Sequence, residues 1–131
     1  MSYWFVKSPF KHHSWEEILL KGKFQFFGIR NYQARNNIRK MEIGEKVLFY
    51  SSSNGRKVFG IMEVSTKAYS DPSTKSEKWF AIDFKPIKTF AKPITLDKIR
   101  KQYPNHKIIK QARVSVVEVS EVEFESIEEL G

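Results

Sequence analysis

The sequence predicts an α+β domain built around a curved or closed, mostly antiparallel β-sheet with several short flanking helices. Three observations support this fold class. Short runs rich in aromatic and β-branched residues recur along the chain, and capping patterns between them start short helices. The chain has 131 residues, which is enough to bury a core without disulfide bonds. We therefore expect residues 1–131 to form one domain.

Local patterns predict the first two elements. Residues 2–7 form an aromatic and β-branched run that is typical of a strand. Ser14, with Glu17 three residues later, makes a capping box, so a helix should begin there and end at Gly22. We expect Trp15, at the start of this helix, to anchor the core.

The segment over residues 26–41, FFGIRNYQARNNIRKM, carries more aromatic, arginine and amide side chains than a connecting segment needs. Residues 24–27 predict a short buried strand, and Gly28 predicts a turn. Asn31 is a good N-cap, so a helix should cover residues 32–40. This segment has the composition of a surface that recognises a ligand.

The two faces of this expected helix should differ. Its apolar stripe, at i, i+4 and i+7, consists of Ala34, Ile38 and Met41. Another face carries Tyr32, Arg35, Asn36 and Arg39. Unpaired N–H groups at the helix start, next to Arg30 and Arg35, make it a place for a phosphate or a polar base edge. A solvated helix whose arginines bind nothing would explain the same pattern.

A β-hairpin is expected next. Residues 46–50 and 57–64 predict two strands, and residues 51–55 supply serine, asparagine and glycine for the turn. Asp71 precedes a proline in a polar loop. Residues 77–85 alternate as a strand, with Trp79 on one face and, on the buried face, Phe80, Ile82 and Phe84.

The segment after this strand predicts a short helix and a final strand. One or two helical turns should span residues 96–101, opened by Thr95 or Asp97. Residues 108–119 are mostly β-branched and predict a strand that contains Arg113 and Ser115.

The chain should close with an acidic amphipathic helix. Ser120 and Glu123 form a second capping box, and apolar residues follow at helical spacing, namely Phe124, Ile127 and Leu130. This helix either packs on the sheet or binds a basic partner protein. We favour packing.

Charge is distributed unevenly along the chain. All 23 Lys and Arg residues lie at or before Arg113, whereas six of the 15 acids follow it. A body this basic favours a polyanionic partner, because cations that neutralise phosphates release counterions. Nucleic acid, either DNA or RNA, is therefore the expected partner class.

Several other functions have little support. The chain has no cysteine, so disulfides, thiolate catalysis and cysteine-bound metal are excluded. His12 and His13 are adjacent in an expected loop and far in sequence from His106, so they are poorly placed to share a metal. There is no phosphate loop or nucleophile elbow. We expect a non-catalytic protein without a metal or cofactor.

Targeting signals are also missing from the sequence. No apolar run approaches the length of a membrane span, and no segment has the pattern of a signal peptide. We therefore expect a soluble, cytoplasmic protein that does not bind membranes.

The central segment carries a family resemblance. Residues 28–39, GIRNYQARNNIR, resemble the signature of the EVE domain, a PUA-like fold. Flanking features match in order: Tyr3-Trp4 with Lys7-Ser8, Ser14-Trp15, Phe49-Tyr50-Ser51, Tyr69 before Asp71-Pro72, Trp79, and Arg113-Val114-Ser115-Val116. The resemblance covers nearly the whole chain and identifies it as a bacterial member of this family.

The resemblance implies a PUA-like pseudo-barrel with a pocket that accepts a modified base, such as 5-methyl- or 5-hydroxymethylcytosine in DNA or a modified RNA base. The base-binding and groove residues would then be Ser8, Trp15, Arg30, Asn31, Tyr32, Arg35, Asn36, Tyr50, Ser51, Trp79, Arg113 and Ser115. A flipped base needs an aromatic to stack on and fixed donors for its edge, and its strand needs cations. Stacking would fall to Trp15, Tyr32 and Trp79.

Three departures from the family pattern lie around the expected pocket. Pro9-Phe10 stands where the family often has Glu-Pro, Phe26 or Phe27 where it often has Trp, and Ser51 where it commonly has His. The identity of the base therefore stays open. A general RNA-binding module without base preference and a protein-interaction adaptor are the alternatives.

Overall fold

The computed structural model describes residues 1–8, 14–52, 56–111 and 113–131. The elements in chain order are β1 (Tyr3–Ser8), α1 (Trp15–Lys21), β2 (Phe24–Phe26), α2 (Tyr32–Lys40), β3 (Lys46–Ser51), β4 (Lys57–Val64), β5 (Tyr69–Ser70), β6 (Phe80–Thr95), α3 (Leu96–Gln102), α4 (Lys107–Lys110), β7 (Val116–Val119) and α5 (Glu121–Glu128). The expectations about His12, His13 and the tip of the hairpin turn lie outside the described residues.

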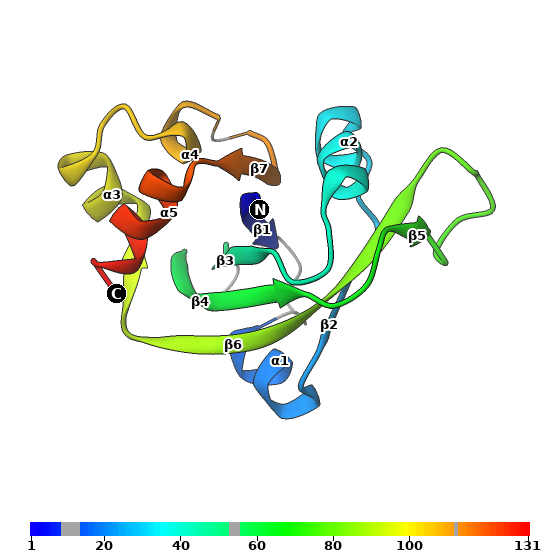
Figure 1. Ribbon diagram of the computed structural model, residues 1–131, viewed down its shortest axis with the longest axis horizontal. Helices are drawn as coiled ribbons and strands as arrows, with labels where there is room; N and C mark the ends of the chain where they lie inside the picture. The colour runs from blue at the N-terminus through cyan, green and yellow to red at the C-terminus, as the bar shows by residue number, and fades with distance from the viewer. Residues whose placement is uncertain (9–13, 53–55, 112) are drawn as a thin grey trace.

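One curled sheet organises the fold. Its strand order is β2-β6-β4-β3-β1-β7, and β5 pairs with β6. The β1–β3 pair is parallel and the other described pairs are antiparallel. Helix α2 packs against both β7 and β6, so it spans the opening between the two halves of the sheet (Figure 1). The expected curved, mostly antiparallel sheet with short flanking helices is confirmed.

Both faces of the sheet are covered, which gives the molecule two hydrophobic cores. In β1 the side chains alternate, so Trp4 and Val6 enter the first core and Phe5 the second. Helices α1 and α2 also pack into the first core, where they bury Trp15, Ile18, Ala34 and Ile38. Helices α3, α4 and α5 lie close together in Figure 1 and pack into the second core. Their buried residues there are Ile99, Ile108, Phe124 and Ile127.

Strand β6 differs from its prediction in both position and length. It begins at Phe80 rather than at residue 77, and it runs for 16 residues to Thr95. Ile82 and Phe84 lie in the first core, whereas Phe90 and Ile94 lie in the second. The extra length lets one strand serve both cores. The pairing of β6 with β4 shifts register twice on the way, which interrupts the simple alternation.

The predicted strand over residues 108–119 is wrong in its first half. Residues Lys107–Lys110 form the short helix α4, and β7 covers only Val116–Val119. The His106 ring starts α4, because its Nδ1 accepts a hydrogen bond from Ile108 N at 3.2 Å. Ile108 is buried in the second core, so tertiary packing overrides the β propensity of the segment.

The capping patterns predicted the helix starts correctly. The hydroxyl of Ser14 accepts from Glu17 N, Asn31 Oδ1 accepts from Ala34 N, and Thr95 Oγ1 accepts from Lys98 N. Gly22 closes α1 with a left-handed φ of 70°, a conformation that favours glycine. Helix α5 packs on the sheet as favoured, with Phe124 and Ile127 buried.

Candidate nucleic-acid interface

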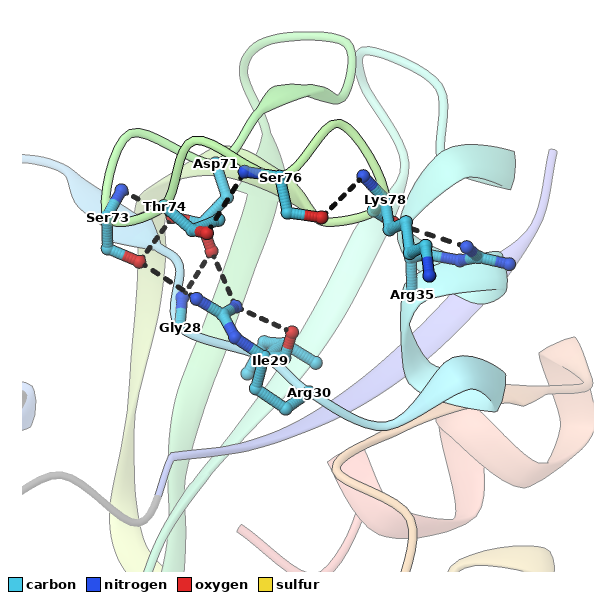
Figure 2. Close-up of polar contacts among 9 residues, drawn as sticks. All are labelled: Gly28, Ile29, Arg30, Arg35, Asp71, Ser73, Thr74, Ser76 and Lys78. Atoms are coloured by element: carbon cyan, nitrogen blue, oxygen red, sulfur yellow. Dashed lines mark hydrogen bonds and ion pairs between the residues drawn. The ribbon is translucent and has the colours of Figure 1, made fainter.

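A buried carboxylate organises the surface next to the start of α2. Asp71 is 2% exposed. It accepts hydrogen bonds from Gly28 N at 2.8 Å, from Arg30 Nη1 at 3.0 Å, and from the N–H and hydroxyl of Ser73 at 2.7 and 2.6 Å (Figure 2). This single side chain therefore ties the turn before α2 to the loop between β5 and β6.

The same contacts keep Asp71 ionised. Burial opposes its charge, but hydrogen bonds from Ser73, Gly28 and Arg30 outweigh that effect and hold the pKa of the carboxyl below its usual value. A fixed negative charge at this point orients the Arg30 guanidinium, which also reaches the carbonyl of Ile29 and the hydroxyl of Ser73 (Figure 2).

Four side chains from this turn, α2 and the β5–β6 loop lie in contact in series. The Arg30 guanidinium lies 5.4 Å from the centre of the Trp79 ring, and the Trp79 and Tyr32 rings lie 5.0 Å apart with 34° between their planes. The Arg35 guanidinium lies 5.0 Å from the centre of the Tyr32 ring. We call Arg30, Trp79, Tyr32 and Arg35 the Arg–aromatic array. Tyr32 is 56% exposed, so the array is open to a ligand.

Hydrogen bonds to neutral groups hold Arg35 in place. Its Nη1 donates to the carbonyl of Lys78 at 3.2 Å, as Figure 2 shows, and its Nε and Nη2 donate to Asn36 Oδ1. No carboxylate of the described segments pairs with Arg35. Its positive charge is therefore available to a phosphate, and the guanidinium is already oriented.

The cationic surface continues along α2. The Arg39 guanidinium lies 4.9 Å from the centre of the Phe80 ring, one helical turn after Arg35. A cavity of about 330 Å³ follows at the end of the helix, lined by Arg39, Lys40, Met41, Glu42, Lys67, Ala68 and Phe80. Guanidinium groups stacked on aromatic rings thus occur on two successive turns of the same helix.

Ser8 and Ser51 mark the ends of two neighbouring parallel strands. They stand opposite each other in the β1–β3 register, and both are fully buried. The Ser8 hydroxyl has no hydrogen-bond partner within the described parts of the chain. A buried polar atom without a partner costs stability, so its retention calls for an explanation such as a ligand contact.

The remaining predicted site residues occupy different surroundings. Ser115 lies beside this strand end, where its carbonyl accepts from Lys7 N at 2.8 Å, and Arg113 is exposed just before it. Trp15 is buried: it stacks on Phe49 and donates to Thr89 Oγ1 at 2.8 Å, which confirms it as a core anchor. The side chain oxygen of Asn31 caps α2.

Tyr50 lies on the opposite face of the sheet from Ser51, because successive residues of a strand point to opposite faces. Its ring packs in the second core, 6.0 Å from that of Phe5. The structure therefore brings Arg30, Tyr32, Arg35, Asn36 and Trp79 together, gathers Ser8, Ser51 and Ser115 at one strand end, and places Trp15 and Tyr50 elsewhere.

The sequence predicted only that Asp71 lies in a polar loop. The side chain is an internal anchor, and Ser73 and the Lys78 carbonyl complete the loop that it holds. The signals in the sequence were a lone acid before a proline and the match of Tyr69 and Asp71-Pro72 to the family pattern. These features do not identify the basic residue that pairs with Asp71.

The described residues contain no group of three or more His, Asp or Glu side chains that could hold a metal ion. None of the described helices combines the length and apolar character needed to cross a bilayer.

A half-barrel with helix α2 across its opening, and an exposed cationic and aromatic surface on that helix, defines a PUA-like domain. The profile of the EVE domain family matches residues 2–130. The chain belongs to the EVE domain family, as its sequence signature predicted.

Solved structures of relatives have the same fold. A crystal structure of a protein from Agrobacterium tumefaciens is 33% identical, with a TM-score of 0.90 over 97% of this chain and 90% of that one. Human THYN1, solved in complex with DNA containing 5-methylcytosine, is 25% identical, with a TM-score of 0.88 over 99% of this chain and 97% of that one.

Sequence comparison also finds thymocyte nuclear protein 1 of several vertebrates. Thymocyte nuclear protein 1 of Danio rerio is 29% identical over 125 residues, an alignment that covers 76% of this chain and 54% of that protein. The chain thus spans about half the length of this relative.

Proposed function

We propose that this protein binds nucleic acid without catalysing a reaction, and that it accepts a modified base such as 5-methyl- or 5-hydroxymethylcytosine. The observation that carries the proposal is the Arg–aromatic array. The exposed Tyr32 ring and the half-buried Trp79 ring, flanked by two guanidinium groups, offer a base a surface to stack on and offer its phosphates cations. Relatedness to human THYN1, which was solved with DNA containing 5-methylcytosine, supports the same partner class.

The strand end at Ser8 supports the base-reading part of the proposal. A base that leaves its stack needs hydrogen-bond partners for its polar edge. The Ser8 hydroxyl is buried without a partner in the described chain, and it can both donate and accept. We assign Ser8, with Ser51 beside it, to the edge of the base, and the Arg–aromatic array to stacking and phosphate contacts.

The test is binding to matched oligonucleotides. We would measure fluorescence anisotropy with unmodified, 5-methylcytosine and 5-hydroxymethylcytosine probes, in DNA and RNA forms, at near-physiological salt. We expect one modified form to bind more tightly, and affinity for every form to fall steeply as salt increases. Equal binding to all probes would contradict base reading and leave a general nucleic-acid-binding module. No binding to any probe would refute the proposal and favour a protein-interaction adaptor.

A further inference from the structure

A polar cavity lies on the face of the sheet opposite to the side chains of Ser8 and Ser51. It has a volume of about 480 Å³ and is lined by Tyr50, Arg56, Thr95, Leu96, Asp97 and Arg100. These residues come from the end of β3, the start of β4, and the junction of β6 with α3. The interface described above uses none of their side chains.

Tyr50 contributes a hydroxyl group without a partner. The residue is only 4% exposed, its ring packs near Phe5, and the Lys7 ammonium lies 5.9 Å from the ring centre. Among the described residues only the Ser8 hydroxyl is fully buried without a hydrogen-bond partner, so the Tyr50 hydroxyl, which bonds to none of the described groups, is accessible from the cavity. Burial raises the pKa of Tyr50, while the charge of Arg56 opposes this rise, so the hydroxyl stays protonated and can donate.

Two arginines give the cavity a positive charge. Arg56 lies close enough to act electrostatically on Tyr50, and Arg100 faces the cavity from α3. Asp97 is the acid that lines the cavity, and its carboxylate meets Arg100 Nη1 at 2.7 Å. Both side chains of that pair are more than half exposed, and exposed pairs of this kind are weak. A doubly hydrogen-bonded phosphate would compete successfully for the same guanidinium.

We propose that this cavity is a second phosphate-binding site, which holds a backbone phosphodiester of the nucleic acid whose base lies at Ser8. The inference rests on the proposed function. Lys7 and Ser8, like Tyr50 and Ser51, are neighbours in their strands and point to opposite faces. The Ser8 site and the cavity at Tyr50 therefore lie at the same end of these paired strands, one on each face of the sheet.

The first test compares two double variants that lose the same charge. R56Q/R100Q removes both arginines of the cavity, whereas K92Q/K101Q removes two exposed lysines outside it. For R56Q/R100Q we expect affinity for modified and unmodified probes to fall alike, by about tenfold. The slope of log affinity against log salt should become shallower by about 0.7, the value for one phosphate of a single strand. Equal losses in the two double variants would overturn the proposal.

Tyr50→Phe isolates the hydroxyl, because it keeps the ring and its packing. We expect affinity to fall about threefold, within the range of a typical net hydrogen bond, with the melting temperature and the preference between bases unchanged. Unchanged affinity in Y50F would remove Tyr50 from the site. A changed preference between bases would instead return Tyr50 to the base pocket and contradict the proposal.

An NMR titration separates failure of this inference from failure of the proposed function. The oligonucleotide should shift the amide signals of Tyr50, Arg56 and Arg100 together with those of Tyr32 and Trp79. Shifts at Tyr32 and Trp79 alone would overturn the second site and leave the proposed function intact. Inorganic phosphate could also shift the cavity signals while the oligonucleotide shifts none of these cavity signals. The cavity would then be a site for small anions, and the proposal that it binds a backbone phosphate would be refuted.

Discussion

Helices α2 and α5 are built alike but use their charges in opposite ways. Each begins at a side-chain cap and buries an apolar stripe in one of the two cores. Two acids of α5 make contacts that stabilise the fold: Glu123 Oε1 accepts from Ser120 N, Glu123 Oε2 accepts from Lys107 N, and Glu128 approaches Lys88. The arginines of α2 stack on aromatic rings and pair with no carboxylate of the described chain.

This difference distinguishes a binding surface from a structural one. A charge that is already paired within the protein contributes to stability, and a ligand must break the pair to use it. A guanidinium that rests on a ring is oriented but keeps its hydrogen-bonding edge for a partner. The contrast between the two helices therefore predicts that changes near α2 alter binding, and that changes in α5 alter folding.

The largest effect is expected for Asp71→Asn, which should impair both folding and binding. The amide leaves Arg30 without its counter-charge and cannot accept from all the donors that now meet the carboxylate. We expect the free energy of unfolding to fall by about 3 kcal/mol, and nucleic-acid affinity to fall with it as Arg30 and the loop shift. Urea denaturation followed by anisotropy would measure both quantities.

Asp71 also supplies a pH test with a defined sign. Its native pKa lies below the ordinary value of 3.8, so the stability it contributes is complete above that value. This stability should be lost as pH falls through the native pKa. The wild type should therefore lose stability more steeply below about pH 4 than D71N. Parallel profiles for the two proteins would show that the carboxylate adds no net stability.

Tyr32→Ala is expected to have the next largest effect, and on binding alone. The side chain is 56% exposed, so the free energy of unfolding should change by less than about 0.5 kcal/mol. The loss of stacking should weaken binding by about 1–3 kcal/mol per base. Anisotropy and thermal melts would separate the two effects. Tyr32→Phe is the matched control, because it keeps the ring and should bind like the wild type.

Ser8→Ala should produce a smaller effect in which stability and recognition change in opposite directions. Replacing a buried hydroxyl that lacks a partner with a methyl group should raise the free energy of unfolding by about 1 kcal/mol. Preference for the modified base should decrease. Ser126→Ala, in α5, is the control for serine loss. A stability loss in S8A with recognition unchanged would show that the hydroxyl serves the fold.

The smallest effect is expected for Glu123→Gln in α5. Burial opposes ionisation here, but hydrogen bonds from Ser120 and Lys107 lower the pKa of the carboxyl, so its charge is part of the cap. Weakening the cap should cost about 0.5–1 kcal/mol of stability and leave nucleic-acid affinity unchanged. Glu129→Gln, at the exposed C-cap of the same helix, should leave the free energy of unfolding unchanged. If E123Q bound nucleic acid with a different affinity from the wild type, α5 would also be part of the binding surface, and the contrast between the two helices would be wrong.

Sequence alone determined the features that depend on near neighbours in the chain. The caps at Asn31 and Ser120, the stripe of Ala34 and Ile38, and the face of Tyr32 and Arg35 all follow from helical periodicity. The family signature is local for the same reason, because most of it lies within one turn and one helix.

Tertiary structure decided the features that depend on distant residues. Part of a β-branched run forms α4 because Ile108 is buried in the second core, and β6 is longer than its prediction because it contributes to both cores. Asp71 became an anchor because folding placed it beside Gly28, 43 residues away. Propensity acts over a few residues, whereas burial and pairing depend on which segments meet, and only the folded chain brings those segments together.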